Sequence, residues 1–493
     1  MRKELLTLLL FPLALILLMI PSRLDAGVSG KISGQVIDAE SGEPIVGATI
    51  RIAEVNLGTM TDEEGDYFII NMPIGKHDVS VSSVGFEGIV KKDVRVLVGL
   101  TTPVDFTMQS EVVELDQNIT VYASNPIIQQ DLTESKVIFT SDRLENLPNI
   151  VTVQSVLTNY PGVVVGREEQ LHVRGGRSGQ VAYYFDGFSV QDPFYNTMGF
   201  RVMPSALEEL SLSSGGYTAE YGDALSGVVS AVTKDGGPKY HGNMRVYEGA
   251  TSCYDVNTGD WGSLEQAGNR SLSFNLSGPV PGASAMRLTF FTAGEFLKDE
   301  TSLPVNGTDA YTWTAKIAAQ PLHNLTVKTN VTVYDASGGV YTHRDVNGIS
   351  YDFNLDGSTA FEKKAYLVGL RSNYNFSENM ILSASINRFR TYTKQAPSHL
   401  MDVYWTEWPG YSEDADGIYD GTIDDDNYLG YRDFNDPTQT IGFTEGDDFC
   451  PLFRMREAIY NSGKLSLLNQ LNKIHQIKGG VEIRRYDISW DSK

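Results

Sequence analysis

The feature that most constrains the fold is an alternation of apolar and polar side chains in the second half of the chain. The stretch LTVKTNVTVYD has an apolar set and an interleaved polar set, namely Leu325, Val327, Val331 and Val333 against Thr326, Lys328, Asn330 and Thr332. Successive side chains of a strand point to opposite faces, so this period of two predicts strands with one apolar and one polar face. The stretch SLSFNLSG alternates in the same way. An apolar outer face and a polar inner face are typical of a transmembrane barrel.

Candidate strands of this kind fill the chain after residue 238. They lie near 241–249, 271–279, 285–297, 311–320, 325–335, 363–376, 381–395, 457–471 and 475–490. Short turns such as GPVPGAS, QPLHN and FSENM alternate with long polar segments. Outer-membrane barrels have this asymmetry, with short periplasmic turns and long external loops. A soluble sandwich would explain the alternation but not the unequal loops.

The N-terminus predicts export. Arg2 and Lys3 precede an apolar run from about Leu5 to Ile20, and Ala26 stands where a signal peptidase would cut. The run is near the lower limit for spanning a bilayer, which favours a cleaved signal peptide over residues 1–26 rather than a membrane anchor. No later stretch reaches about 20 apolar residues, so we expect no transmembrane helix.

Charge and cysteine content narrow the class further. A net charge of -23 over 493 residues argues against nucleic-acid binding, which needs a basic surface. The two cysteines are too few for a disulfide scaffold. By strand counting, Cys253 and Cys450 both fall in external loops, so the sequence allows one disulfide between them.

Residues 27–110 predict a small β-sandwich, because short strands alternate with turn signals. The stretches GQVIDAESGEPIVGATIRI, GTMTDEEGDYFI and VSVSSVGFEG resemble the carboxypeptidase regulatory-like domain, a transthyretin-like sandwich. A zinc carboxypeptidase needs a His-x-x-Glu pair, and none of the seven histidines begins one. The sandwich is therefore interpreted as an accessory module, and no enzyme activity or cofactor is expected.

Two turn-forming stretches stand out in the next region. In LHVRGGRSGQVAYYFDGFSV, β-prone residues flank Asp186 and Gly187, a dipeptide that favours a tight primed hairpin turn. The earlier turn contains Arg174, Gly175, Gly176 and Arg177. It lacks the Gly-Lys-Ser/Thr ending of a phosphate-binding loop, so we interpret its glycines as backbone turns.

Three segments, in order along the chain, are similar to the plug domain of TonB-dependent outer-membrane receptors. They are LPNIVTVQSVLTNYPGVVV, the stretch around these turns, and LEELSLSSGGYTAEYGDALSGVVSAVTKDGG. The resemblance implies an α/β plug at 136–238 inside a β-barrel in the outer membrane of a Gram-negative-type bacterium, with the N-terminal domain in the periplasm. In such a plug we expect Arg174 and Arg177 to pair with carboxylates of the surrounding wall, and direct contact with the ligand is the alternative.

The same resemblance assigns a coupling segment. In the linker 111–135, the residues Ile119, Thr120, Val121, Tyr122 and Ala123 fall where the family has its TonB box. Such a peptide adds as a strand to a TonB-type energy-coupling protein, and its backbone provides the affinity. The expected activity is energy-dependent uptake of an unknown solute, with or without a surface lipoprotein, by a receptor embedded in outer-membrane lipid. An exported binding or adhesion protein is the alternative. A signalling receptor is disfavoured, because it would carry a mixed α/β domain at its N-terminus where this chain has a sandwich.

Two polar loops allow calcium. Asp352, Asn354 and Asp356 are spaced like the start of a calcium loop, although a glutamate is missing at its twelfth position. Asp414, Asp416 and Asp420 lie in a second, strongly acidic loop. A solvated acidic loop would have the same composition.

Together these observations predict a mainly β chain: a sandwich, a plug, and the first nine or so antiparallel strands of a transmembrane barrel over 239–493. Plugged barrels have about 22 strands, so we expect an incomplete barrel, an open curved sheet that partly wraps the plug.

If the acidic loops bind calcium, chelation should increase protease cleavage between Asp345 and Asp448, because the loops would lose the ion that orders them. Limited proteolysis with and without EGTA, read by mass spectrometry, measures this. Identical cleavage patterns would exclude calcium ordering.

Overall fold

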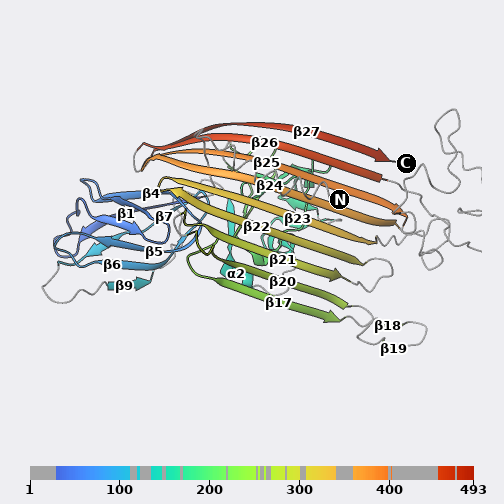
Figure 1. Cartoon of the computed structure of the whole chain (residues 1–493), viewed down its shortest axis with the longest axis horizontal. Helices are drawn as coiled ribbons and strands as arrows, with labels where there is room; N and C mark the ends of the chain where they lie inside the picture. Colours follow the sequence, from blue (N-terminus) through green and yellow to red (C-terminus); the bar gives the residue numbers. More distant parts are fainter. Residues whose placement is uncertain are drawn as a thin grey trace, which may run out of the picture.

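The computed structural model shows a β-sandwich, a plug and a long curved sheet (Figure 1). It describes residues 29–110, 119–122, 135–146, 152–166, 170–217, 220–250, 254–255, 260–261, 268–283, 286–299, 307–339, 359–397, 401, 454–471 and 475–492.

The sandwich packs two sheets around one apolar core. One sheet has the order β4-β1-β7, with β8 also pairing with β1. Its strands are β1 (Gly30–Asp38), β4 (Asp66–Met72), β7 (Thr101–Pro103) and β8 (Phe106–Met108). The other has the order β3-β2-β5-β6-β9. Its strands are β2 (Thr49–Ile52), β3 (Leu57–Met60), β5 (Gly75–Ser82), β6 (Ile89–Val96) and β9 (Ile119–Tyr122). The alternating residues Val79 and Val81 of β5 are both buried in the core, as their period predicts.

The plug is a second body with a five-stranded mixed sheet in the order β10-β15-β16-β13-β14. Its strands are β10 (Lys136–Thr140), β13 (Val181–Phe185), β14 (Phe188–Ser189), β15 (Leu207–Ser213) and β16 (Gly227–Thr233). A smaller pair joins β11 (Val163–Val165) and β12 (Leu171–Val173), and single 3-10 turns are η2 (Ser178–Gln180) and η3 (Pro204–Ala206).

Two short helices cover the plug sheet. Helix α2 begins at Ser141 and ends at Asn146. Helix α3 (Val153–Leu157) is capped by Thr152, whose hydroxyl accepts a hydrogen bond from the Ser155 amide.

The third body is a nine-stranded antiparallel sheet, here called the wall. Its strands are β17 (His241–Ala250), β20 (Gly268–Pro279), β21 (Thr289–Asp299), β22 (Thr308–Leu322), β23 (Leu325–Gly339), β24 (Thr359–Ser377), β25 (Met380–Pro397), β26 (Arg454–Gln470) and β27 (Gln476–Ser492). A short hairpin of β18 (Tyr254–Asp255) and β19 (Asp260–Trp261) follows β17. Neighbours in sequence are neighbours in the sheet, so the nine predicted strands and their antiparallel order are confirmed.

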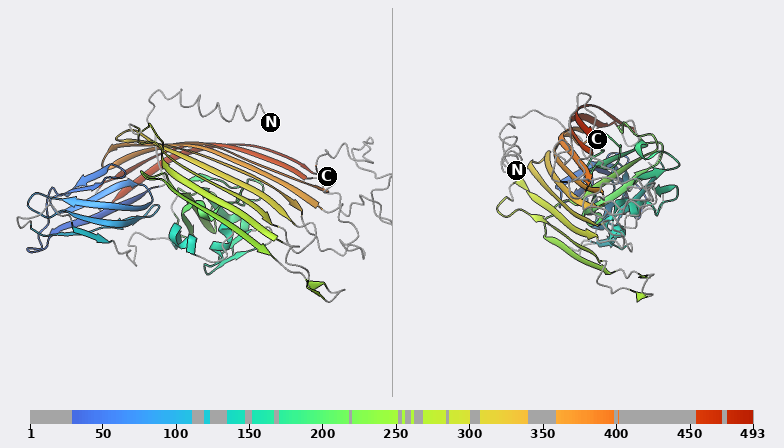
Figure 2. Two further views of the ribbon diagram at one scale, coloured as in Figure 1. Left: turned by 60° about the horizontal axis from the view of Figure 1, so that its bottom comes forward. Right: turned by 90° about the vertical axis from the view of Figure 1, so that its right-hand side faces the viewer.

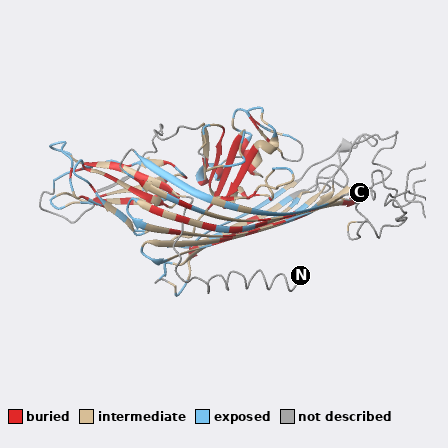
Figure 3. Ribbon diagram, turned by 90° about the horizontal axis from the view of Figure 1, so that it is seen from above, coloured by how far each residue is buried: buried red, intermediate tan, exposed pale blue. Residues whose placement is uncertain are grey.

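The wall curves, and the plug lies on its concave side (Figure 2). The alternation predicted for β23 is observed, because Asn330 and Thr332 are buried while Val331 and Val333 are only partly covered. Burial on the wall is concentrated where the plug covers it (Figure 3). The polar face predicted from sequence is therefore the face that holds the plug.

The sandwich lies at the end of the wall where the short turns are (Figure 1). β17 and β27 are the two edges of the wall and do not pair with each other in the described part, so this sheet is open, as expected. No helix among the described residues is long and apolar enough to cross a membrane.

Candidate functional site

The dipeptide Asp186-Gly187 forms a two-residue turn that reaches the wall. Both residues have positive φ, 48° and 78°, as a primed turn requires, and Phe185 pairs directly with Phe188 across it. Aspartate is one of the few residues that adopt a positive φ readily. At this position its carboxylate lies outside the hydrogen-bonded ladder of the two strands. The turn therefore presents an acidic side chain at the plug surface.

The Asp186 carboxylate is buried among donors from the plug and the wall. It accepts hydrogen bonds from the Thr233 amide (3.0 Å) and hydroxyl (2.8 Å) and from Lys316 Nζ (2.9 Å). Lys316 projects from β22 and is itself 7% exposed. An uncompensated charge would be costly there, so the pair depends on both bodies staying in contact.

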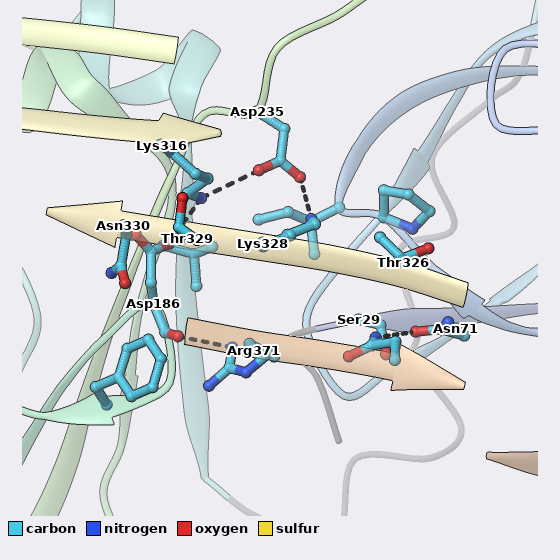
Figure 4. Close-up of a pocket in the computed structure, with 15 residues that line it drawn as sticks. Ser29, Asn71, Asp186, Asp235, Lys316, Thr326, Lys328, Thr329, Asn330 and Arg371 are labelled. Atoms are coloured by element: carbon cyan, nitrogen blue, oxygen red, sulfur yellow. Dashed lines mark hydrogen bonds and ion pairs between the residues drawn. The ribbon is translucent and has the colours of Figure 1, made fainter. Parts of the chain in front are cut away.

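A second plug carboxylate, Asp235, lies between two wall lysines (Figure 4). It forms ion pairs with Lys316 (3.1 Å) and Lys328. Burial by itself would raise the pKa of Asp235, but these two lysines outweigh that effect and hold its pKa well below the usual range. Asp235 is therefore a fixed anion that joins neighbouring strands β22 and β23 to the plug.

The wall also accommodates the hairpin by shape. Arg371 Nη1 donates to the Asp186 carbonyl oxygen (2.7 Å), and its guanidinium lies 4.7 Å from the centre of the Phe188 ring. Beside it, a Cβ atom at Gly369 would lie 2.5 Å from the Phe188 ring. Only glycine leaves room for this ring, so Gly369 allows the plug hairpin to pack closely against β24.

Further ion pairs join the plug to the last strands of the wall. Glu220 pairs with Lys464 (2.8 Å) and Lys478, and Asp223 pairs with Arg484 (2.7 Å). Burial would raise the pKa of Glu220, but Lys478 and Lys464 lower it to about 2. The plug thus offers mainly carboxylates and the wall mainly cations.

The sandwich is bonded to the plug through polar side chains. Arg95 pairs with Asp142 and lies 3.8 Å from Glu208. Glu209, only 2% exposed, accepts a hydrogen bond from the Val98 amide (2.9 Å). Burial raises the pKa of Glu209, because desolvation penalises its charged form.

The sandwich is also bonded to the rim of the wall. Asn373 Nδ2 donates to Asn71 Oδ1 (2.7 Å), and Asn71 Nδ2 donates to Asn375 Oδ1 (3.2 Å). Thr59 donates to Glu378 in the turn after β24 (3.0 Å). Sandwich, plug and wall meet around a cavity of about 60 Å³. Into this cavity projects Asn330, whose buried amide has no hydrogen-bond partner among the described residues.

The other predicted turn has a different role from the one expected. Arg174 and Gly175 have φ of 49° and 77°, and Gly176 donates to the Val173 carbonyl oxygen (2.9 Å). Arg174 Nη2 donates to Ser135 Oγ (2.6 Å), a contact within the plug. Neither Arg174 nor Arg177 forms an ion pair with a wall carboxylate in the described part of the chain, so the expected pairing is not observed there. The acidic turns Asp186, Glu220 and Asp235 reach the wall instead.

The candidate coupling segment lies beside the sandwich. Ile119–Tyr122 forms β9, which pairs in parallel with β6 at the edge of its sheet. Ala123 lies outside the described residues, as do the candidate calcium ligands Asp352, Asn354, Asp356, Asp414, Asp416 and Asp420 and the cysteines Cys253 and Cys450. The calcium sites and the disulfide stay predictions.

Comparison with known proteins identifies two of the three bodies. The carboxypeptidase regulatory-like domain model matches residues 31–109, and the TonB-dependent receptor plug domain model matches residues 128–228. The chain carries the plug of a TonB-dependent receptor. This receptor is an outer-membrane protein, with the sandwich and plug on the periplasmic side.

Three similar proteins show how distant the known relatives are. The TonB-dependent transporter Oar of Myxococcus xanthus is 22% identical over 229 residues, which are 44% of this chain and 21% of Oar. Among solved structures, the siderophore receptor PirA from Pseudomonas aeruginosa is 13% identical with a TM-score of 0.41, covering 72% of this chain and 57% of PirA. The ferric citrate transporter FecA is 14% identical with a TM-score of 0.48, covering 73% and 48%. The receptor chain thus spans less than two thirds of the length of these relatives.

We expect Lys316→Met to loosen the plug, because it leaves Asp186 and Asp235 with one buried cation fewer, at a cost of about 3–5 kcal/mol. Cells that express the variant should become more sensitive to vancomycin, which needs a large pore. Lys364→Met is the matched control, since Lys364 is about half exposed and pairs with Glu362 of the same strand. Equal sensitivity of the two variants would contradict a locking role for Lys316.

Acid should loosen the contact at Glu220. Its pKa is lowered from 4.5 to about 2, so the stabilisation is complete above pH 4.5 and is lost as the pH falls toward 2. Calorimetry of plug unfolding between pH 6 and pH 3 should show a smaller loss of melting temperature for Glu220→Gln than for the unchanged receptor. Glu145→Gln, which removes a half-exposed plug carboxylate, should keep the original pH dependence.

Proposed function

We propose that this receptor takes up a scarce or large solute across the outer membrane, with its plug moved by an inner-membrane energy-coupling complex. The observation that carries the proposal is the contact between plug and wall. A plug with its own sheet lies on the concave face of a membrane-type sheet, and both discrete ion pairs and apolar contacts hold it there. Such contacts hold the plug firmly while closed, and both partners can be hydrated once they separate.

Ile119–Ala123 is the proposed attachment point for the coupling protein. The segment precedes the first plug strand, β10, so a pull on it is transmitted along the chain into the plug. Adding an extended segment to the edge of a partner's sheet needs only backbone groups, and alternate side chains supply specificity. The partner is therefore a TonB-type protein with an exposed sheet edge.

We propose no catalytic step for the receptor. Its regulatory-like sandwich contributes binding surface, as the contacts of Arg95 and Asn71 illustrate. The solute binds from outside, over the plug and the external loops, and a surface lipoprotein is a further candidate partner. PirA is a siderophore receptor, and FecA is a ferric citrate transporter. For this receptor we propose a solute that is either scarce or large.

Plug movement can be tested without knowing the solute. Ala293 lies on the inner face of β21, is fully buried, and contacts Met203 and Ala206 of the plug. In a Cys253→Ser, Cys450→Ser background, Ala293→Cys should react with an impermeant maleimide in energised native host cells. A protonophore should stop the reaction, because no force then reaches the plug.

Adding Val121→Pro should have the same effect as the protonophore, since proline removes a backbone donor from the added strand. Glu114→Pro, in the preceding linker, is the matched control and should leave labelling unchanged. Labelling that persists in the Val121→Pro receptor would contradict energy coupling through this segment and would favour a binding protein without transport.

A further inference from the structure

We propose that the external ends of the plug and of strands β24–β27 form a binding site for an anionic solute that carries a flat ring. Arg177 and Lys363 are its charged contacts, and Tyr195 is its ring contact. The inference rests on the proposed function, because an uptake receptor must bind its solute on the outer side of the plug. It adds the chemical class of that solute.

The site lies at the end of the wall opposite the sandwich (Figure 1). At this end residues 340–358 separate β23 from β24, and residues 398–453 separate β25 from β26. Long connections of this kind face outward in outer-membrane barrels. The plug turn with Arg177 is at the same end. Its Arg174 donates to Ser135, which precedes β10, whereas Asp142 after β10 contacts the sandwich.

Strand alternation separates the charges of β23–β27 by face. One row of Cα partners on the concave face, in step with the plug-covered Ala365, contains Ala336, Lys363, Thr393, Arg456 and Trp490. The next row outward contains Gly338, Phe361, Gln395, Arg454 and Ser492. Neither row has an acidic residue. The convex face of the same strand ends has Asp335, Glu362, Glu457 and Asp487.

The cations of the two faces differ in their partners. Three convex-face cations each have a carboxylate partner: Lys364 with Glu362, Arg390 with Glu457, and Arg485 with Asp487. On the concave face, Lys363 and Arg454 form no ion pair with the described residues, and neither do the two arginines of the plug turn. Lys363 and Arg177 are also exposed. Unpaired cations gathered on one surface attract anions, even in a chain with a net charge of -23.

Contacts join the plug turn to the cations of the wall. The 3-10 turn η2, which follows Arg177, packs against Asn196. The neighbouring Tyr195 has the Arg456 guanidinium 4.3 Å from its ring centre. Arg456 lies in the same row as Lys363, with only β25 between their strands. Tyr195 is 47% exposed, so it offers a surface on which a flat ring can pack beside the cations.

An anionic porphyrin is a direct probe of this site. Tetracarboxyphenylporphyrin joins carboxylates to a flat ring, and the negative net charge of the receptor repels it from most of the surface. Fluorescence anisotropy measures its binding to the receptor in a non-ionic detergent at low salt, because salt screens exposed charges. We expect saturable binding. Its absence would overturn the proposal.

Matched variants locate the site. Arg177→Gln with Lys363→Gln removes two of its cations and should weaken porphyrin binding about tenfold. Lys364→Gln with Arg485→Gln changes the net charge equally but on the convex face, and should leave binding unchanged. All four side chains are exposed, so neither variant removes a buried partner. Equal weakening in the two variants would show that binding follows net charge, and the site would be overturned.

Competition tests the ring contact. Benzenetricarboxylate and propanetricarboxylate carry the same charge, but only the first has a ring. We expect benzenetricarboxylate to displace the porphyrin at a lower concentration, and Tyr195→Ala to remove this difference. Equal displacement by the two anions from the unchanged receptor would contradict a ring contact.

The outcomes separate this inference from the proposed function. Porphyrin binding needs no energy source, whereas labelling of Ala293→Cys depends on the proton gradient. If the porphyrin does not bind but gradient-dependent labelling is observed, the anionic class alone is overturned. If the porphyrin binds at the matched cations but labelling ignores the gradient, the proposed uptake is overturned, and the surface is the ligand site of a binding protein.

Discussion

Each strand sends alternate side chains to opposite faces, so a sheet with one face suited to lipid has to place the polar half of its residues on the other. The wall of this receptor follows that constraint over nine strands, and its concave face is lined by groups such as Asn330, Thr332 and Lys316. These groups need water or protein partners. The plug supplies the protein partners, and its position, its charges and its attachment to the sandwich all follow from that need.

The plug and the wall carry mostly opposite charges where they meet. Carboxylates of the plug meet cations of the wall at Asp186, Asp235 and Glu220, and Arg201 with Glu295 is the one reversed pair among those of the described residues. Removing a single partner leaves a buried charge, which is costly. Separating the whole surfaces lets water reach both sides. A contact made in this way is sensitive to the loss of one partner but tolerates complete release.

Local chemistry made much of the fold predictable from sequence. The alternation around Val331 located the wall strands, and the Asp186-Gly187 dipeptide marked a turn because few residues other than Asn, Asp and Gly accept positive φ. The partner of Asp186 was not predictable, since Lys316 lies 130 residues away and only the folded sheet brings the two together. One signal was available: Lys316 is a charged residue in an inward-facing row with Ala310, Thr312 and Thr314. The prediction that Arg174 contacts the wall was wrong for the same reason. A resemblance to a family identifies the turn but not the residues that lie opposite it in the folded protein.

The conformation of Asn71 limits how freely the sandwich could be exchanged between receptors. Its φ of 60° lies in the left-handed region, at an irregular point in the pairing of β1 with β4. Glycine would suit this backbone but lacks the amide that meets Asn373 and Asn375, and most longer side chains would strain it. A regulatory-like domain grafted from another protein could therefore fold correctly and still fail to seat on the rim. The sandwich is modular in its fold but not in its attachment, and Asn71 is one of the residues responsible.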